Sequence, residues 1–355
     1  MIIMKLFCVG PVEMADDILK IGSRKLPYFR TQEFSQLLLD TEYMLKKLLG
    51  AGENSNVAIL TASGTGAMEA AVINVFNQSD KVLVIDGGSF GYRFAQICSI
   101  HNIPCEVLKL DFGERLTYEH LEKYDKKGFT GMLVNLHETS TGQLYDIKML
   151  SRFCKDNNMF LIVDAISTFL ADSFHMGDYG IDLTIISSQK GLALYPGLSI
   201  ICANSRIVEE KISCNSPPTL YFRLADYFKN MERGQTPYTP AQGIIYQLNA
   251  KLKQIYETGI DVYIKRCENL ANDFRFRAKE IPVLIPSYPL SNALTPIILK
   301  NRNAYELFLQ LKEKYNIIVT PSGGELRNIL LRIGHIGELT VDDNKMLIEI
   351  LKREL

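Results

Sequence analysis

Between about Asn56 and Asn204, short apolar runs alternate with longer amphipathic ones. The short runs are typical of buried strands and comprise Val57–Thr61, Lys81–Ile85, Cys105–Lys109, Thr130–Asn135, Phe160–Val163, Leu183–Ile186 and Ser199–Cys202. Helical patterns lie between most of them, as at Thr65–Phe76, Phe90–His101 and Ile147–Asn157. Strands that alternate with helices favour a mainly parallel sheet with both faces covered. We therefore expect an α/β fold whose ligands bind at the carboxyl ends of the strands.

After Ser205 the alternation stops and a different unit begins. Helices are predicted over Thr219–Lys229 and over Gln242–Lys279, the second with a break at Glu257–Gly259. From Ile281 the pattern is mixed, with strands expected at Thr295–Leu299, Asn316–Thr320 and Ile329–Ile333, and helices at Ala304–Tyr315 and Val341–Leu351. We therefore expect an N-terminal segment 1–14, a large domain 15–250 and a small α+β domain 251–355.

Composition excludes several classes of protein. Lys and Arg number 39 against 40 Asp and Glu, so no positive field exists to hold nucleic acid or an anionic membrane. No apolar run reaches the ~20 residues of a membrane span, and the acidic residues after Met1–Gly10 argue against a signal peptide. The seven cysteines form no CxxC pair and the five histidines no HExxH motif, so we expect neither disulfides nor a metal site. A cytoplasmic protein is expected.

A turn rich in small residues follows the first of these strands. Its core is Ser63-Gly64-Thr65-Gly66, and backbone N–H groups at such a helix start can close on a phosphate. A tight turn that binds nothing is one alternative. A dinucleotide site is another, because Asp86 ends the next strand, but Glu69 stands where that fingerprint needs a third glycine.

An acid and a lysine each follow a later strand. Asp164 ends the run Met159–Val163, where a helix cap or a solvated turn is the simpler interpretation. Lys190 lies between two apolar runs, although most lysines are solvated surface groups. A lysine in a dry cleft has a lowered pKa and can form a Schiff base. A phosphate cradle, an acid and a lysine in this order are what pyridoxal 5′-phosphate requires.

With these motifs in view, the chain resembles the class V aminotransferases of fold type I. This group holds the alanine–glyoxylate, serine–glyoxylate and 2-aminoethylphosphonate–pyruvate transaminases. The resemblance spans nearly the whole chain, through the segments Gly10-Pro11, Phe29–Phe34, Ser63–Glu69, His137–Gly142, Val163–Ala165, Ser188–Gly191, Gln235–Pro240 and Leu331–Gly337. It implies a large domain with a mainly parallel seven-stranded sheet and a smaller α+β C-terminal domain.

The resemblance also implies roles for individual residues. Lys190 would bond covalently to pyridoxal phosphate and move the substrate proton, and Asp164 would pair with the cofactor's ring nitrogen. Arg332 would bind the acid group of the substrate. The remaining cofactor contacts would be Ser63, Gly64, Thr65, Phe90 as the stacking ring, Thr139, Gln189 and, from a neighbouring subunit, Thr239. The implied assembly is a homodimer with shared active sites.

The function implied is a ping-pong transaminase. It would move an amino group between alanine, serine or 2-aminoethylphosphonate and a 2-oxo acid, pyruvate or glyoxylate. The motifs favour neither the glyoxylate nor the phosphonate branch. A lyase or desulfurase of the same fold is the first alternative, although no cysteine follows Cys267. A nicotinamide-dependent dehydrogenase is the second alternative, but it would give Lys190 no role in the chemistry. His335 could bind substrate or be a packed, hydrogen-bonded core residue.

Overall fold

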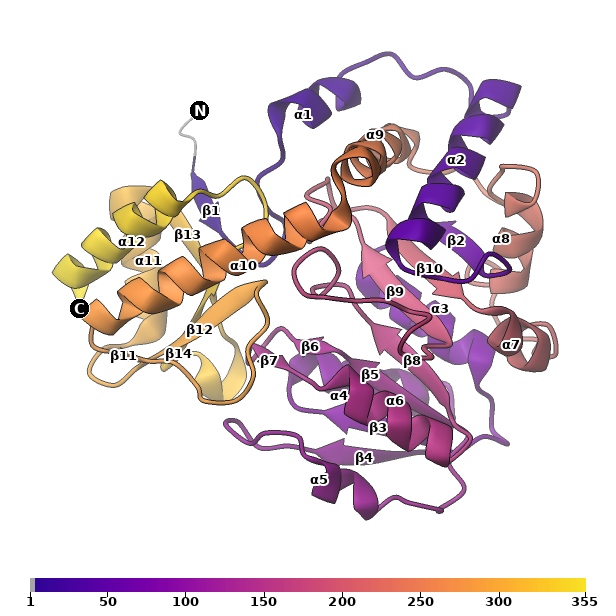
Figure 1. Ribbon diagram of the computed structural model, residues 1–355, viewed down its shortest axis with the longest axis horizontal. Helices are drawn as coiled ribbons and strands as arrows, with labels where there is room; N and C mark the ends of the chain where they lie inside the picture. The colour runs from indigo at the N-terminus through magenta and orange to yellow at the C-terminus, as the bar shows by residue number, and fades with distance from the viewer. Residues whose placement is uncertain (1–3) are drawn as a thin grey trace.

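The computed structural model describes residues 4–355, so residues 1–3 of the expected N-terminal segment lie outside the described residues. Its larger sheet has seven strands in the order β2-β10-β9-β8-β5-β3-β4 (Figure 1). These strands are β2 (Asn56–Leu60), β3 (Val82–Asp86), β4 (Cys105–Lys109), β5 (Gly131–Asn135), β8 (Phe160–Asp164), β9 (Leu183–Ser187) and β10 (Ser199–Ala203). Only β10 pairs antiparallel with its two neighbours, which confirms the mainly parallel seven-stranded sheet.

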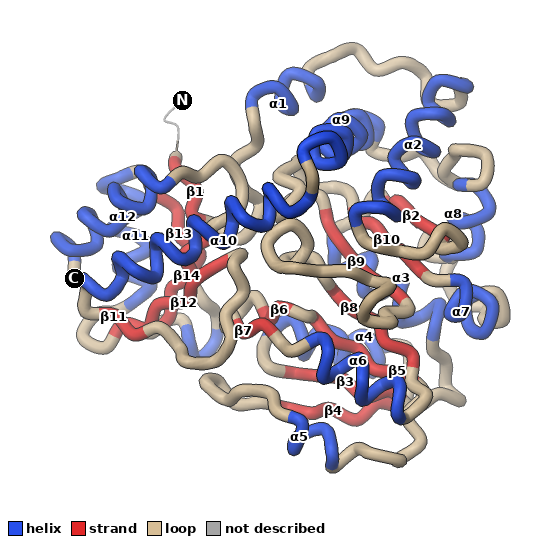
Figure 2. The backbone as a smooth tube through the Cα atoms, viewed as in Figure 1, coloured by secondary structure: helices blue, strands red, loops and turns tan. Residues whose placement is uncertain are grey.

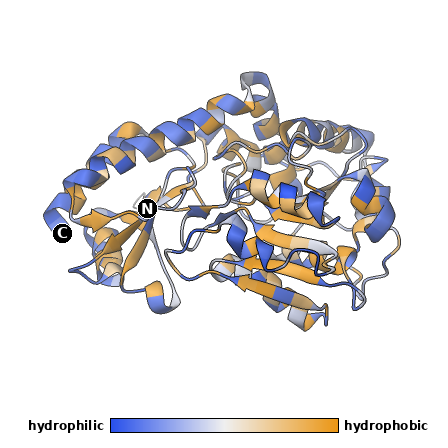
Figure 3. Cartoon of the chain, turned by 60° about the horizontal axis from the view of Figure 1, so that its bottom comes forward, coloured by the Kyte–Doolittle hydropathy of each residue, from blue (hydrophilic) through white to orange (hydrophobic). Residues whose placement is uncertain are grey.

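Successive residues of the strands face opposite layers of helices. In β2, Val57 and Ile59 face one hydrophobic cluster, whereas Ala58 and Leu60 face another. The first cluster contains residues of α2 (Gln32–Leu48), α5 (Tyr118–Glu122), α6 (Ile147–Asp156) and α9 (Gln242–Thr258); the second contains residues of α3 (Gly64–Val75), α4 (Ser89–Ile100), α7 (Ser205–Ile207) and α8 (Leu224–Met231). Figure 3 shows the strands as mostly hydrophobic bands between helices with hydrophilic outer faces. Burial on both faces explains why the strands are continuous apolar runs rather than alternating ones.

A second sheet holds the C-terminal part of the chain together. Its strands lie in the order β1-β13-β14-β12-β11. They are β1 (Lys5–Phe7), β11 (Val283–Leu284), β12 (Leu294–Leu299), β13 (Ile317–Pro321) and β14 (Leu330–Gly334), which pack with α10 (Ile260–Arg277), α11 (Ala304–Tyr315) and α12 (Val341–Glu354). The N-terminal strand β1 pairs parallel with β13, a long-range contact that no local pattern predicts. Lys5–Phe7 are therefore held against the C-terminal sheet.

The helices α9 and α10 run from the large sheet to the small one (Figure 2). Between them lies Gly259, whose φ of +94° is costly for a residue with a Cβ. The predicted break at Glu257–Gly259 is thereby confirmed. The predicted helix Thr219–Lys229 is wrong at its start, because α8 begins only at Leu224. The Asn74 side chain bonds the backbone O of Phe222 and the backbone N of Leu224, and so holds the preceding turn out of the helix.

The smaller elements complete the chain. Helix α1 (Asp16–Gly22) packs on α9, and the hairpin of β6 (His137–Glu138) and β7 (Gln143–Leu144) follows β5. No helix among residues 4–355 has the length and apolarity required to cross a bilayer.

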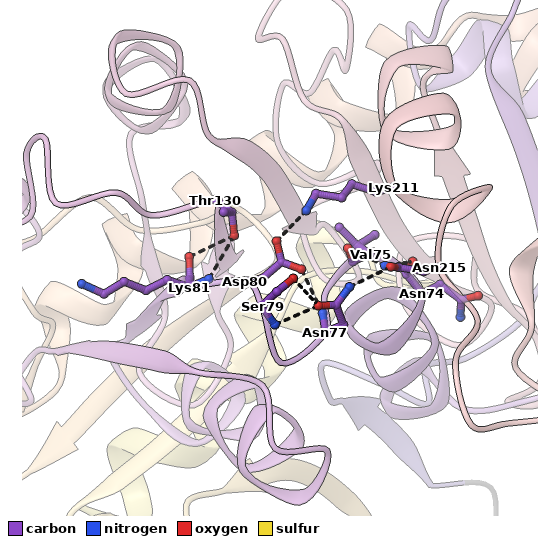
Figure 4. Close-up of polar contacts among 9 residues, drawn as sticks. All are labelled: Asn74, Val75, Asn77, Ser79, Asp80, Lys81, Thr130, Lys211 and Asn215. Carbon is purple, nitrogen blue, oxygen red and sulfur yellow. Dashed lines mark hydrogen bonds and ion pairs between the residues drawn. The ribbon is translucent and has the colours of Figure 1, made fainter.

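The amino ends of the strands are closed by polar contacts. Asp80 accepts a hydrogen bond from the backbone N of Asn77 and forms an ion pair with Lys211 (Figure 4). Asn77 donates to Asn215, which in turn donates to the backbone O of Asn74 and Val75. Because these groups satisfy one another, this edge is structural, and the chemistry-bearing residues lie at the opposite edge.

Candidate active site

The carboxyl edge of the large sheet collects the residues singled out by sequence. Asp164 is the last residue of β8, and Lys190 lies three positions after β9. Ser63 caps α3 after β2, which has the same direction as β9 because both are antiparallel to β10. Parallel direction places all three groups at one edge, as expected for an α/β sheet.

Lys190 is held in a tight loop against the N-terminal segment. The Ser188 hydroxyl donates to the backbone O of Tyr195 at 2.7 Å and fixes the loop. A Cβ on Gly10 would lie 2.5 Å from Cδ of Lys190, so only glycine allows this approach. Burial and the nearby charge of Arg332 together lower the pKa of Lys190 to about 8, against the opposing charges of Asp164 and Cys8. The amine is therefore partly unprotonated near neutral pH.

This pKa gives a first testable prediction. In the apoprotein, carbamylation of Lys190 by cyanate should rise with pH around a midpoint near 8, because only the neutral amine reacts. Mass spectrometry would follow Lys190 and the exposed Lys229 in the same sample. Lys229 reports the response of a solvent-exposed lysine under the same conditions. Identical profiles for the two lysines would contradict the prediction.

Asp164 is a buried carboxyl without a cationic partner. It is 6% exposed and accepts a 2.8 Å hydrogen bond from the backbone N of Ile166. Burial and the charge of Glu138 raise the pKa of Asp164 to about 7, although the hydrogen bond from Ile166 and the charges of Lys190 and Arg93 oppose the shift. No ion pair among residues 4–355 includes Asp164, Lys190 or Arg332. Such a carboxyl suits a ligand that brings its own positive charge.

The start of α3 forms a cradle of small residues. Ser63 caps the helix without using its hydroxyl, and Ser63 and Thr65 are exposed. A Cβ on Gly64 would lie 2.4 Å from Cδ1 of Ile166, so this backbone lies directly beside the Asp164 loop. Arg93 donates to the Thr65 hydroxyl at 3.1 Å. Free N–H groups, hydroxyls and this guanidinium together suit a phosphate.

Two further predicted cofactor contacts flank the cradle. Phe90 lies in the first turn of α4, and the guanidinium of Arg93 stacks 4.9 Å from its ring centre. Gln189 precedes Lys190 and accepts a hydrogen bond from the Ser187 hydroxyl. Both side chains are partly buried. The stacking ring and the amide therefore belong to the same edge of the sheet as the acid and the lysine.

Arg332 reaches this edge from the second sheet. It lies in β14 and donates to the backbone O of Thr139 at 2.9 Å and of Pro321 at 2.7 Å. Thr139 is buried, and its hydroxyl bonds that of Ser167 at 2.8 Å. Burial lowers the pKa of Arg332 to about 10, a cost that a bound anion would relieve. Sequence reasoning found Thr139 and Arg332 but did not identify Ser167.

Two predicted residues lie outside this group. His335 is buried, its Nε2 lies 2.8 Å from the Thr295 hydroxyl, and its ring packs on Phe274. The core interpretation of His335 therefore holds. Thr239 is exposed, and the structure gives it no contact with Lys190 or Asp164 of its own chain. Its neighbour Ala241 donates its backbone N–H to the Thr61 hydroxyl at 2.9 Å, which fixes the segment beside the start of the α3 turn.

The structure also adds residues that the sequence did not reveal. His137 is 2% exposed, and neither ring nitrogen has a hydrogen-bond partner among the described residues. Burial lowers the pKa of His137 to about 3, so its ring is neutral. The Nε of Arg332 is also buried without a partner. Unpartnered polar atoms beside a lysine and an unpaired carboxyl fit a polar ligand such as pyridoxal phosphate.

Comparison with known proteins agrees with this geometry. The profile of the family "Aminotransferase class-V" matches residues 26–320. An uncharacterised aminotransferase of Methanocaldococcus jannaschii is 32% identical, over 92% of this chain and 86% of that protein. L-aspartate–glyoxylate aminotransferase of Paracoccus denitrificans is 26% identical, over 94% and 87%. A crystal structure of a subgroup IV aspartate aminotransferase from Thermus thermophilus superposes with a TM-score of 0.90 at 26% identity, covering 99% of both chains.

Proposed function

Because the chain belongs to the class V aminotransferase family, we propose that it moves an amino group from a small amino donor to a small 2-oxo acid with pyridoxal 5′-phosphate as cofactor. We propose Lys190 and Asp164 as the catalytic residues. The other cofactor contacts proposed are Ser63, Gly64, Thr65, Phe90, Thr139 and Gln189. The cytoplasmic location and the domain limits 15–250 and 251–355 remain predictions.

The proposed work of each residue follows from its surroundings. When bound, pyridoxal phosphate supplies a conjugated electron sink for the electron pair left at the substrate Cα after deprotonation. Asp164, buried at the end of β8, would hold a proton against the cofactor's ring nitrogen. Lys190, whose amine titrates near neutral pH, would accept the Cα proton and return it during amino transfer. The helix α3 N-terminus would anchor the phosphate.

The observation that carries the proposal is that Asp164 and Arg332 lie near enough to Lys190 for their charges to act on it, while none of the three forms an ion pair within residues 4–355. A buried acid and two partly buried cationic groups cost solvation free energy unless a ligand compensates them. A guanidinium offers a planar fork to a carboxylate. An amino acid or 2-oxo acid supplies that carboxylate, which would place its reacting carbon toward Lys190.

The donor is the finer part of the proposal. Alanine, serine and 2-aminoethylphosphonate are the donors that the sequence favours, with pyruvate or glyoxylate as acceptor. The relatives named above add aspartate as a donor and support glyoxylate as an acceptor. A visible spectrum of the holoenzyme, recorded after each of the four donors without acceptor, tests this. Conversion to the pyridoxamine form with one donor supports the proposal, and no change with any of them contradicts it.

We also propose a homodimer in which Thr239 reaches the phosphate site of the partner subunit. Its exposure leaves it available to a second copy. Thr239→Glu should then weaken cofactor binding by charge repulsion, and light scattering should show a dimer. Mixing Lys190→Ala with Thr239→Glu subunits should restore activity, because each mixed dimer contains one site with both native residues. If mixing restores nothing, the shared-site proposal is wrong.

A further inference from the structure

Glu138 is a fully buried carboxylate with donors on several sides. It is 0% exposed and accepts hydrogen bonds from the backbone N of Gly91 at 2.9 Å and of Phe90 at 3.4 Å. The Asn135 side chain donates at 2.9 Å, and Ser140 donates through its backbone N at 3.0 Å and through its hydroxyl. These donors belong to the start of α4, the end of β5 and the turn after β6. One side chain therefore joins three segments.

Two of these three segments, the start of α4 and the turn after β6, also carry a residue of the candidate site. Phe90, the proposed stacking ring, is bound through its own backbone N–H. Thr139 lies between Glu138 and Ser140, and its backbone O accepts the Arg332 guanidinium at 2.9 Å. The turn that contains Glu138 therefore binds Phe90, a proposed cofactor contact, on one side and Arg332, the proposed substrate anchor, on the other.

The environment fits a negative charge held in place by dipoles. Two donors are backbone N–H groups in the first turn of α4, where the helix dipole favours an anion. Hydrogen bonds to a charged acceptor are about twice as strong as neutral ones. The field of Glu138 also reaches the site, since it raises the pKa of both Asp164 and Arg332.

We propose that Glu138 is a positioning residue of the active site, which holds Phe90 against the cofactor ring and, through Thr139, holds Arg332 at the substrate carboxylate. This inference rests on the proposed function. Removing the charge should therefore alter cofactor binding and acid-substrate binding together, although Glu138 itself is fully enclosed by protein groups.

A matched control is present at the opposite edge of the sheet. Asp182 is 2% exposed and accepts from the backbone N of Leu161 at 2.8 Å and from Asn204 at 3.0 Å. It precedes β9 and so lies at the amino ends of the strands. Asp182→Asn removes a buried, hydrogen-bonded charge without touching the candidate site, so it reports the general cost of such a loss.

The experiment compares wild type, Glu138→Gln and Asp182→Asn as apoproteins. Calorimetric titration with pyridoxal 5′-phosphate measures affinity, which suits a chain without tryptophan. Induced circular dichroism of the bound cofactor reports the orientation of its ring. We expect Glu138→Gln to weaken cofactor binding by about tenfold or more, to change the induced signal and to raise KM for the 2-oxo acid. Asp182→Asn should lower Tm but leave all three values at wild type.

Three outcomes overturn the inference. One is cofactor affinity and induced signal of Glu138→Gln that match wild type, and the second is equal losses in Asp182→Asn. If wild-type apoprotein does not bind pyridoxal phosphate, the proposed function fails first and the inference with it. If Glu138→Gln does not fold, Ser140→Ala removes one hydroxyl donor from the same carboxylate and should give the same effects in smaller measure. An unchanged Ser140→Ala would then contradict the inference.

Discussion

Replacing Lys190 with alanine is expected to lower transamination by more than about 10⁴-fold, because one side chain both holds the cofactor and moves the substrate proton. The loss should appear in kcat rather than in KM for the acid substrates, since Arg332 is unchanged. Without cofactor, the Lys190→Ala protein should be at least as stable to unfolding as the wild-type protein. Lys190 has no ion-pair partner, and burial disfavours its charged form.

The measurement is a single-turnover half-reaction with the best donor, with cofactor binding followed by its visible spectrum. Lys211→Ala is the control, since Lys211 forms an ion pair with Asp80 at the amino edge of the sheet (Figure 4). That variant should lose stability and keep activity. A Lys190→Ala protein that turns over at the wild-type rate would remove Lys190 from the mechanism.

Replacing Arg332 with glutamine should raise KM for acid substrates about 100-fold. Truncating one partner of a buried charge pair costs about 2–5 kcal/mol, and each 1.4 kcal/mol is tenfold in binding. The guanidinium is held by the carbonyl groups of Thr139 and Pro321, and no carboxylate within residues 4–355 forms an ion pair with it. Arg332→Lys keeps the charge but loses the planar fork, so its KM should lie between that of wild type and that of Arg332→Gln.

A raised KM could reflect lost binding of the substrate carboxylate or a general disturbance of the site. Steady-state kinetics with a 2-oxo acid and with the matching aldehyde separate these two causes. The aldehyde lacks the carboxylate, so its weak binding should not change further in Arg332→Gln. Arg275 gives a control, because it too is a partly buried arginine that donates to carbonyl groups, those of Ser291 and Leu294. Arg275→Lys should lower Tm and leave KM unchanged. Equal KM values for wild type and Arg332→Gln would show that Arg332 does not bind the substrate carboxylate.

Most of the large sheet could be predicted because its signals are local. Strands buried on both faces must be apolar throughout, so runs such as Phe160–Val163 differ sharply from the amphipathic helices between them. The parallel direction of β8 and β9 then places their last residues at one edge. Asp164 and Lys190 are therefore together in the structure, as their places at strand ends indicated.

The sequence-based predictions were wrong or missing where residues distant in the chain determine the local structure. The start of α8 is set by the Asn74 side chain, which lies far away in the sequence. Strand β1 exists because β13 is there to pair with it. Ser167 and Glu138 gave no separate signal, since a serine or a glutamate in a turn is usually solvated and only packing shows these two to be buried.

Local patterns alone predicted the strands of the large sheet, the helices at Thr65–Phe76, Phe90–His101 and Ile147–Asn157, and the places of Asp164 and Lys190 after strands, because apolar runs and their periodicity involve neighbouring residues. They did not predict the helix α2 or the order of the strands. Long-range packing was needed to show that Arg332 of the second sheet meets Thr139 in the turn between β6 and β7, that His335 is a core residue, and that Glu138 joins three segments. Burial accounts for this difference. Whether a charge is solvated or enclosed, and with which partner, depends on groups that are close in space but remote in the chain.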